Sequence, residues 1–145
     1  MKKLSEQLKK EATSMSVCST FMSEWDNMGL VEKYYEGAEW CMEREYPSYE
    51  ILDKYDKEMV AYGVYNRKKI DIIADKEKYV FNGSEATLTV EDYKVCRVFV
   101  GRNTKLHIIA KRNAIVIVTR FTGSEVTRET SGGAKCIIWD KELEI

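Results

Sequence analysis

The sequence from Gly83 to Glu142 repeats every ten residues, and this repeat limits the possible folds more than any other feature. Written in tens, it reads GSEATLTVED, YKVCRVFVGR, NTKLHIIAKR, NAIVIVTRFT, GSEVTRETSG and GAKCIIWDKE. The first position of each unit is mostly Gly or Asn, residues that favour turns. The fourth and sixth positions are mostly apolar. Alternate residues of a strand share one face, so each unit predicts a turn and a strand with these two positions in the core.

A fixed period without insertions is typical of stacked repeats, because each unit must stay in register with the next. One turn and one strand cannot close a coil, but two units make a coil of about twenty residues with two faces. We therefore predict a short, flattened β-solenoid of about three coils. The alternative is an antiparallel β-meander or sandwich, whose loops tolerate varying lengths and explain the fixed period less well.

The outward positions of the two predicted faces differ in character. One face stacks Glu85, Lys105 and Glu125, and beside them Thr87, His107 and Thr127. The other face carries apolar residues that need a cover, either the preceding helices or a second copy of the chain. These candidate interface residues are Val95, Phe99, Ile115, Ile117, Ile137 and Trp139.

Residues 1–62 have helical periodicity. Apolar residues three and four apart form a stripe between Thr20 and Tyr46, which Pro47 ends. Ser48 then suits the N-cap of a helix over residues 49–62, and Gly63 suits its C-terminal end. Residues 63–82 read as a connector with short strands, followed by the repeat at 83–142. The fold class is thus α+β, with the helices and the repeat in one compact unit.

The four cysteines are spaced unlike zinc ligands, which favours free buried thiols in a reducing compartment. The chain has no apolar run long enough to span a membrane, and its basic N-terminus lacks the apolar region of a signal peptide. We therefore expect a cytoplasmic protein of a bacterial host cell, without membrane contact, metal or cofactor. Two residues depart from the repeat: Lys94 at a position otherwise small, and Arg128 at one otherwise apolar. A buried Arg128 would need a carboxylate or carbonyl partner.

The segments EGAEWCMEREYPSYEIL, AYGVY, FNGSEATL and GGAKCIIWDKE resemble small uncharacterised proteins of phages and integrated mobile elements from gut anaerobes. The CSTFMSEWDN segment is similar too. These segments carry scaffold residues. The resemblance therefore implies a phage or mobile-element origin, and it supplies no catalytic residue.

Catalytic motifs are not evident in the sequence. The chain's one histidine, His107, falls between two threonines on an outward column, without a nucleophile beside it. Glu39 and Glu43 are four residues apart, a spacing that on an acidic helix is typical of solvated side chains. The GRNTK segment lacks the spacing of a phosphate-binding loop. We expect no enzyme activity.

Basic residues concentrate between Tyr93 and Ser124, where no acidic residue occurs, although the formal net charge of the chain is −1. The predicted register neutralises Lys105 with Glu85 and Glu125, Lys111 with Glu91, and Arg112 with Asp92. Arg97, Arg102 and Arg120 are left as candidate ligands for an anion, unless the acidic helices of this chain or of a neighbour pair with them.

Three functions follow from these patterns. The first is a non-enzymatic interaction protein that forms homo-oligomers or binds a host protein. The second is a protein that binds a small anionic ligand, such as a nucleotide signal of host defence, and sequesters it. The third is a nucleic-acid-binding accessory protein. Duplex DNA fits poorly, since the basic residues lie on strands and turns rather than on one helix.

Overall fold

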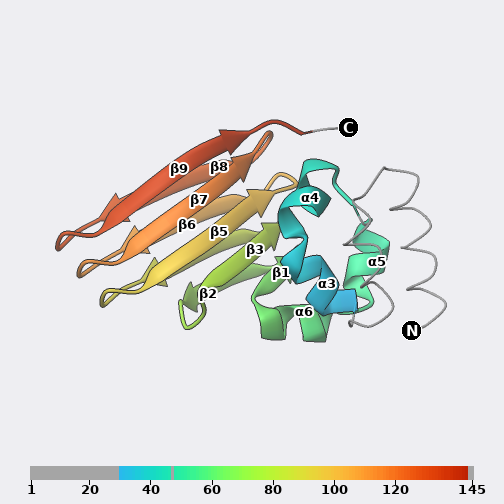
Figure 1. Cartoon of the computed structure of the whole chain (residues 1–145), viewed down its shortest axis with the longest axis horizontal. Coiled ribbons are helices and arrows are strands. Elements are labelled where there is room, and N and C mark those ends of the chain that lie inside the picture. Colours follow the sequence, from blue (N-terminus) through green and yellow to red (C-terminus); the bar gives the residue numbers. More distant parts are fainter. Residues whose placement is uncertain (1–29, 47, 144–145) are drawn as a thin grey trace.

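The computed structural model describes residues 30–46 and 48–143, in which short helices precede a stack of strands (Figure 1). The helices are α3 (Leu30–Glu36), α4 (Ala38–Glu43), α5 (Tyr49–Asp53) and α6 (Asp56–Tyr62). The predicted apolar stripe lies partly before residue 30, outside the described residues. Its later part is buried as expected, at Val31, Tyr34, Ala38, Cys41 and Met42.

The helix predicted over residues 49–62 is interrupted at Lys54 and Tyr55. The N–H groups of these two residues bond to Ile51 and Leu52, three residues back rather than four, so that α5 ends in a tight turn before α6 begins. Ser48 has the extended backbone of an N-cap residue, without a side-chain cap hydrogen bond. Gly63 ends α6 with φ of 90°, the left-handed conformation predicted for it.

The strands form two parallel sheets in which sequence neighbours alternate between sheets. The odd sheet has the order β1-β3-β5-β7-β9 and the even sheet β2-β4-β6-β8. The strands are β1 (Val64–Asn66), β2 (Lys69–Ile73), β3 (Lys78–Asn82), β4 (Glu85–Val90), β5 (Val95–Gly101), β6 (Lys105–Ala110), β7 (Ile115–Phe121), β8 (Glu125–Thr130) and β9 (Lys135–Lys141). This is a β-solenoid of about 4 turns. The antiparallel alternative is wrong, because every strand pair in the described part of the chain is parallel.

Strand register follows the stacking expected from the sequence. In the even sheet Lys105 pairs with Glu85 and Glu125. In the odd sheet Ile115 pairs with Val95 and Lys135, and Thr119 pairs with Phe99 and Trp139. Side chains of equivalent positions therefore stack along each sheet.

The solenoid begins before the expected boundary at residue 83. Strands β1 and β3 pair with each other and β3 with β5, while β2 pairs with β4. The expected connector at residues 63–82 thus holds the first turn of the solenoid and the strand that opens the second, which is why the coils exceed the three that the repeat predicts. Partners there are only sixteen residues apart, as for Lys69 and Glu85, so the first turn falls outside the ten-residue pattern.

The turns explain the first position of the repeat. Each residue there has a positive φ: Gly83, Tyr93, Asn103, Asn113, Gly123 and Gly133. In four turns the preceding residue, Asp92, Arg102, Arg112 or Gly132, has a positive φ as well. Two successive positive φ values are the backbone of a type I′ turn, which Gly and Asn adopt at the lowest cost.

The space between the two sheets is filled by the inward positions of the repeat. Leu88, Val98, Ile108 and Val118 are buried, and three stacked rings, Tyr65, Tyr79 and Phe81, fill the first turns. The last turn is open in the described residues, because no further coil covers β8 and β9. Arg128 therefore stays exposed at an inward position and donates from Nη1 to the carbonyl oxygen of Cys136 at 2.7 Å.

The helices pack on the outer face of the odd sheet, at the end where its strands finish (Figure 1). Met42 of α4 reaches the sheet at Gly101, where a Cβ would stand 2.9 Å from the methionine methyl group. Gly101 thus leaves room for this methyl group, which would have to shift if a side chain stood here. Lys141 of β9 also contacts α4, since its Nζ donates to Glu39 at 2.6 Å and to Glu43. None of the helices in the described ranges has the length and apolar character of a membrane span.

Candidate interaction surface on the odd sheet

The helices cover only part of the outer face of the odd sheet. Val64, Val80, Phe99 and Phe121 pack in one cluster with the helices. Phe99 is 4% exposed, so this candidate interface residue belongs to the intramolecular core instead. The cover ends there because α3 and α4 are short and lie over β1, β3 and the ends of β5 and β7 (Figure 1).

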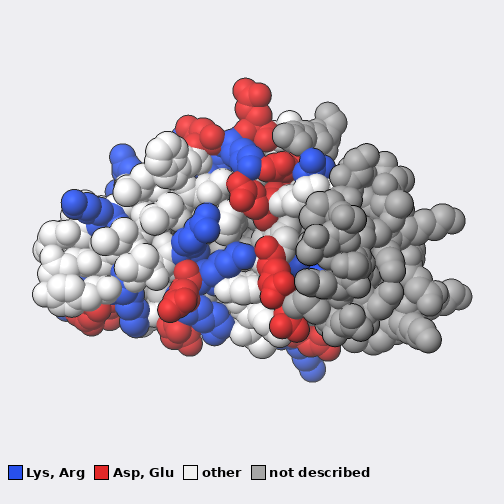
Figure 2. Space-filling view, in the orientation of Figure 1, with Lys and Arg blue, Asp and Glu red and all other residues white. Residues whose placement is uncertain are grey.

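The remaining outward residues form an uncovered apolar patch, which we define as Val95, Ile115, Ile117, Ile137 and Trp139. Val95 is 53% exposed, Ile115 37%, Ile137 42% and Trp139 64%, while Ile117 is half-buried. Ile117 pairs with Ile137 and Ile115 with Val95, so the patch is continuous across β5, β7 and β9. The same view in space-filling form shows a broad uncharged area over the end of the sheet away from the helices (Figure 2).

The outer face of the even sheet is polar. Beside the stack of Lys69, Glu85, Lys105 and Glu125, the neighbouring column holds His107, whose Nδ1 lies 2.6 Å from Thr127 Oγ1. His107 Nε2 lies 3.6 Å from a Glu129 carboxylate oxygen. A shallow groove runs between these columns. The contacts of His107 are those of a histidine in a surface ladder, with no serine or cysteine nucleophile among the groove residues.

The three arginines proposed as anion ligands occupy different environments. Arg97 is exposed on the outer face of β5 and makes no ion pair with a described residue; its guanidinium lies 5.3 Å from the centre of the Phe99 ring. Arg102 is buried at the turn after β5, against the ring of Tyr49. Arg120 donates from Nε to Asp140 at 2.6 Å, which lowers the pKa of Asp140. Five residues along a strand span about 16 Å, so Arg97 and Arg102 do not converge on one ligand.

Arg97 is instead brought next to Lys78, its register partner on β3. The ammonium group of Lys78 lies 4.4 Å from the centre of the Tyr35 ring and donates to the Tyr35 carbonyl oxygen at 2.5 Å. Burial and the neighbouring Arg97 lower the pKa of Lys78. Two cations side by side on adjacent strands repel each other, so this pair attracts anionic groups. A hollow lined by Tyr35, Lys78, Lys94 and Arg97, but also by Asp75 and Glu77, adjoins it.

In the rest of the basic stretch, Arg112 is neutralised within the solenoid. Arg112 forms an ion pair with Asp92 at 2.6 Å, as predicted. It forms a second ion pair at 2.7 Å with Glu91, the residue that was predicted to neutralise Lys111. Lys94, at a position otherwise small, is exposed and donates to the carbonyl oxygen of Ala74.

The groups considered for chemistry are held in structural contacts. Glu39 and Glu43 pair with Lys141 rather than standing free in solvent. Cys41, Cys96 and Cys136 are free and buried as predicted, whereas Cys18 lies outside the described residues. Burial raises the pKa of Cys41 and of Cys96 to about 12. The charges of Arg102 and Arg44 lower the pKa of Cys41, but their effect is smaller than that of burial. The described residues contain no cluster of three or more metal-binding side chains.

Two exposed residues outside the patch were not among the residues predicted from the sequence. Tyr93 is 76% exposed and holds a positive φ that a bulky residue adopts at a cost. Ile73, at the end of β2, is also exposed. The signal for Tyr93 was its position in a column otherwise filled by Gly and Asn.

Comparisons with family models, with curated proteins and with solved structures find no match for this chain. The resemblance to proteins of phages and mobile elements therefore stays a prediction.

Proposed function

We propose that this chain is a non-enzymatic interaction protein that self-associates through the apolar patch of the odd sheet. In this proposal the solenoid is a two-faced plate built on the ten-residue repeat, with the even sheet turned to water and the odd sheet turned to the partner. The observation that carries it is the exposure of four large apolar side chains on one continuous strip of a rigid sheet. Monomeric proteins rarely expose continuous apolar patches, and such patches mark sites of contact with other molecules.

Among the patch residues, Trp139 should contribute the largest free energy of association when it is buried. A whole tryptophan side chain offers about 250 Å². At 64% exposure, about 160 Å² of Trp139 is free to be covered. At about 25 cal/mol per Å² the upper limit is about 4 kcal/mol for each copy that buries it. Association entropy and imperfect fit consume part of this gain. Substitution of Trp139 should still weaken the dimer at least about 100-fold, the equivalent of about 3 kcal/mol.

A second candidate function is binding of an anionic ligand, which the Lys78–Arg97 pair supports. A nucleotide signal of a host defence system would bring both the phosphates for these cations and a ring for the neighbouring aromatic side chains. Arg102 and Arg120 are engaged within the chain and do not add to this site. A nucleic-acid-binding accessory role rests on the same two cations and has no further support. A mobile-element origin and a location in the bacterial cytoplasm belong to the same set of proposals.

The deciding experiment is light scattering on a gel-filtration column over a range of protein concentrations, together with native mass spectrometry of the protein as purified. We expect the mass of a dimer or larger assembly for the parent chain, without added mass. Trp139→Ser should shift the midpoint of the transition between monomer and assembly to a higher protein concentration. Ile73→Ser removes an exposed apolar side chain outside the patch and should leave it unchanged.

A parent chain that stays monomeric at the highest concentrations would refute self-association. A bound mass of a few hundred daltons, lost in an Arg97→Ala variant, would favour the anionic ligand instead.

A further inference from the structure

On the outer face of the odd sheet, the helices stand above the uncovered apolar patch. We call the boundary between the helices and the patch the step. Helices α3 and α4 rest on the end of the odd sheet where Phe121 and Gly101 lie, whereas no described helix lies over the patch at Val95, Ile115 and Ile137 (Figure 1). A helix packed on a sheet adds a layer about 10 Å thick. The uncovered area is thus lower than the helices by about the thickness of one helix.

Charge is divided across the same step. Lys78 and Arg97 lie on the sheet side, where the patch begins, and Glu36 and Glu39 lie on the helix side. Both glutamates are close enough to Lys78 to raise its pKa against the effects of burial and of Arg97. Figure 2 shows Asp and Glu side chains along the boundary between helices and sheet, with Lys and Arg side chains beside them on the sheet side, where further Asp and Glu side chains also lie.

The arrangement fits a second copy of the chain. We infer that two copies meet face to face around a two-fold axis that runs along the step. This inference rests on the proposed self-association and specifies its geometry. The rotation places the helices of each copy over the apolar patch of the other, where the missing layer is one helix thick. An isologous contact of this kind must be self-complementary, and the step satisfies that requirement in shape.

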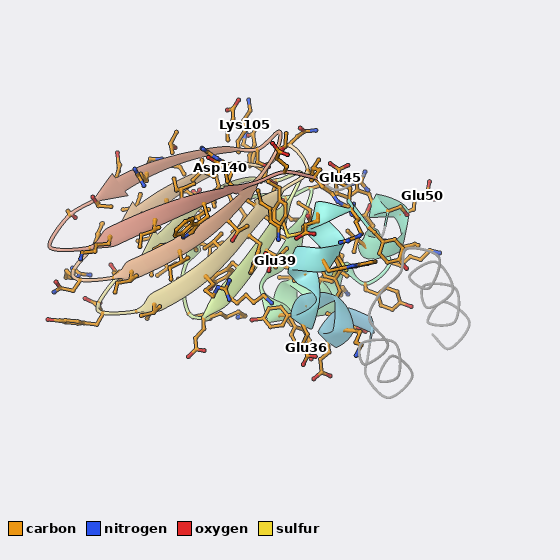
Figure 3. The ribbon with its side chains drawn as sticks, turned by 45° about the horizontal axis from the view of Figure 1, so that its top comes forward. Glu36, Glu39, Glu45, Glu50, Lys105 and Asp140 are labelled. Carbon is orange, nitrogen blue, oxygen red and sulfur yellow. The ribbon has the colours of Figure 1, made fainter. Side chains whose placement is uncertain are left out.

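The same rotation also makes the two contacting surfaces complementary in charge. It carries the acidic side of the step in one copy over the basic side in the other, so that Glu36 of each copy faces Arg97 of its partner. Glu36 is exposed at the free margin of the helices (Figure 3), and no described residue forms an ion pair with it. Arg97 is likewise exposed and without an ion pair in the described chain. Complementary charges of this kind fix the orientation of a contact whose area is mainly apolar.

Repulsion between like charges would disfavour the alternative dimer, in which the apolar patches of the two copies contact each other directly. There the cations at the margin of the patch, Arg97 and Lys135, would approach their own copies across the axis. Both are exposed on the outer face of the odd sheet. The step arrangement avoids this repulsion, because the cations of each copy meet acidic helices.

A charge-exchange experiment tests this geometry. Two full-length variants, Arg97→Glu and Glu36→Lys, are studied alone and as an equal mixture by sedimentation velocity. Each variant alone should dimerise at least about 10-fold more weakly than the parent chain, because both contacts of its dimer join like charges. The mixture should regain the parent affinity, since both contacts then join opposite charges. Glu50→Lys is the control, because Glu50 lies on the other side of the helices (Figure 3) and should not alter the affinity.

Two results would overturn the inference, and they differ. A parent dimer whose affinity neither variant changes would leave self-association intact and remove the step geometry. A parent chain that is monomeric throughout would remove both. Circular dichroism of each variant confirms that a loss of dimer is not a loss of fold.

Discussion

Tyr93 offers a direct test of how the solenoid turns are built. It is the only bulky side chain among the six first-position residues of the repeat, all of which have a positive φ. Asn103 and Asn113 hold φ values of 63° and 64°, next to 64° at Tyr93, so the backbone requirement is the same in the three turns. Replacing Tyr93 with Asn should therefore relieve strain without changing the turn.

The size of the gain follows from the backbone cost. A left-handed conformation costs an ordinary residue about 1–2 kcal/mol, and Asn pays only part of this. The Tyr93 side chain is 76% exposed, so its removal forfeits little packing. We expect Tyr93→Asn to raise the free energy of unfolding by about 0.5–1 kcal/mol. For a chain of this size the melting temperature should rise by roughly 2–4 °C.

Thermal unfolding followed by circular dichroism measures this effect, at a concentration where the protein is monomeric. Tyr93→Ala is the matched control: it removes the ring but keeps a Cβ, so it should give no comparable gain. An unchanged or lower melting temperature for Tyr93→Asn, or an equal rise for Tyr93→Ala, would refute the assignment of strain to this turn.

Two further substitution and labelling results should follow from the described contacts. Lys141→Met should lower the free energy of unfolding by about 1–2 kcal/mol in urea titrations, because it leaves the mostly buried carboxylate of Glu43 without this partner; an unchanged midpoint would show that the contact between α4 and β9 adds nothing. Burial raises the pKa of both thiols, that of Cys96 to about 12, but Cys136 lies in the open last turn and is 8% exposed, whereas Cys96 is 0% exposed. At pH 8 a maleimide should therefore label Cys136 well before Cys96, as read by peptide mass spectrometry, and equal rates would contradict an open C-terminal end.

The stacking of the strands could be read from the sequence because it is a local, repeated property. Each unit must place its apolar positions on the next, so a fixed period specifies the neighbours of Lys105, Ile115 and Thr119. The first turn was missed for the same reason. Its strands are spaced by sixteen residues and so carry no trace of the period.

Register reasoning would also have found the partner of Arg120. Asp140 lies opposite it on β9, twenty residues later. The prediction applied this register to Lys105 and Arg112 but left Arg120 among the unpaired cations. The burial of Arg102 could not be found in this way, because its surroundings are Tyr49 and the helices rather than the neighbouring coil.

For residues 83–142 the sequence by itself predicted the strands, the inward and outward positions and the turn residues, because these depend on contacts between equivalent positions of neighbouring coils. Only the tertiary structure decided which outward residues are covered. The helices are joined to the solenoid by contacts far apart in the chain, such as Lys141 with Glu39 and Met42 on Gly101, and no periodicity encodes them. That docking buries Phe99 and leaves Trp139 exposed, although the two side chains belong to the same outward column.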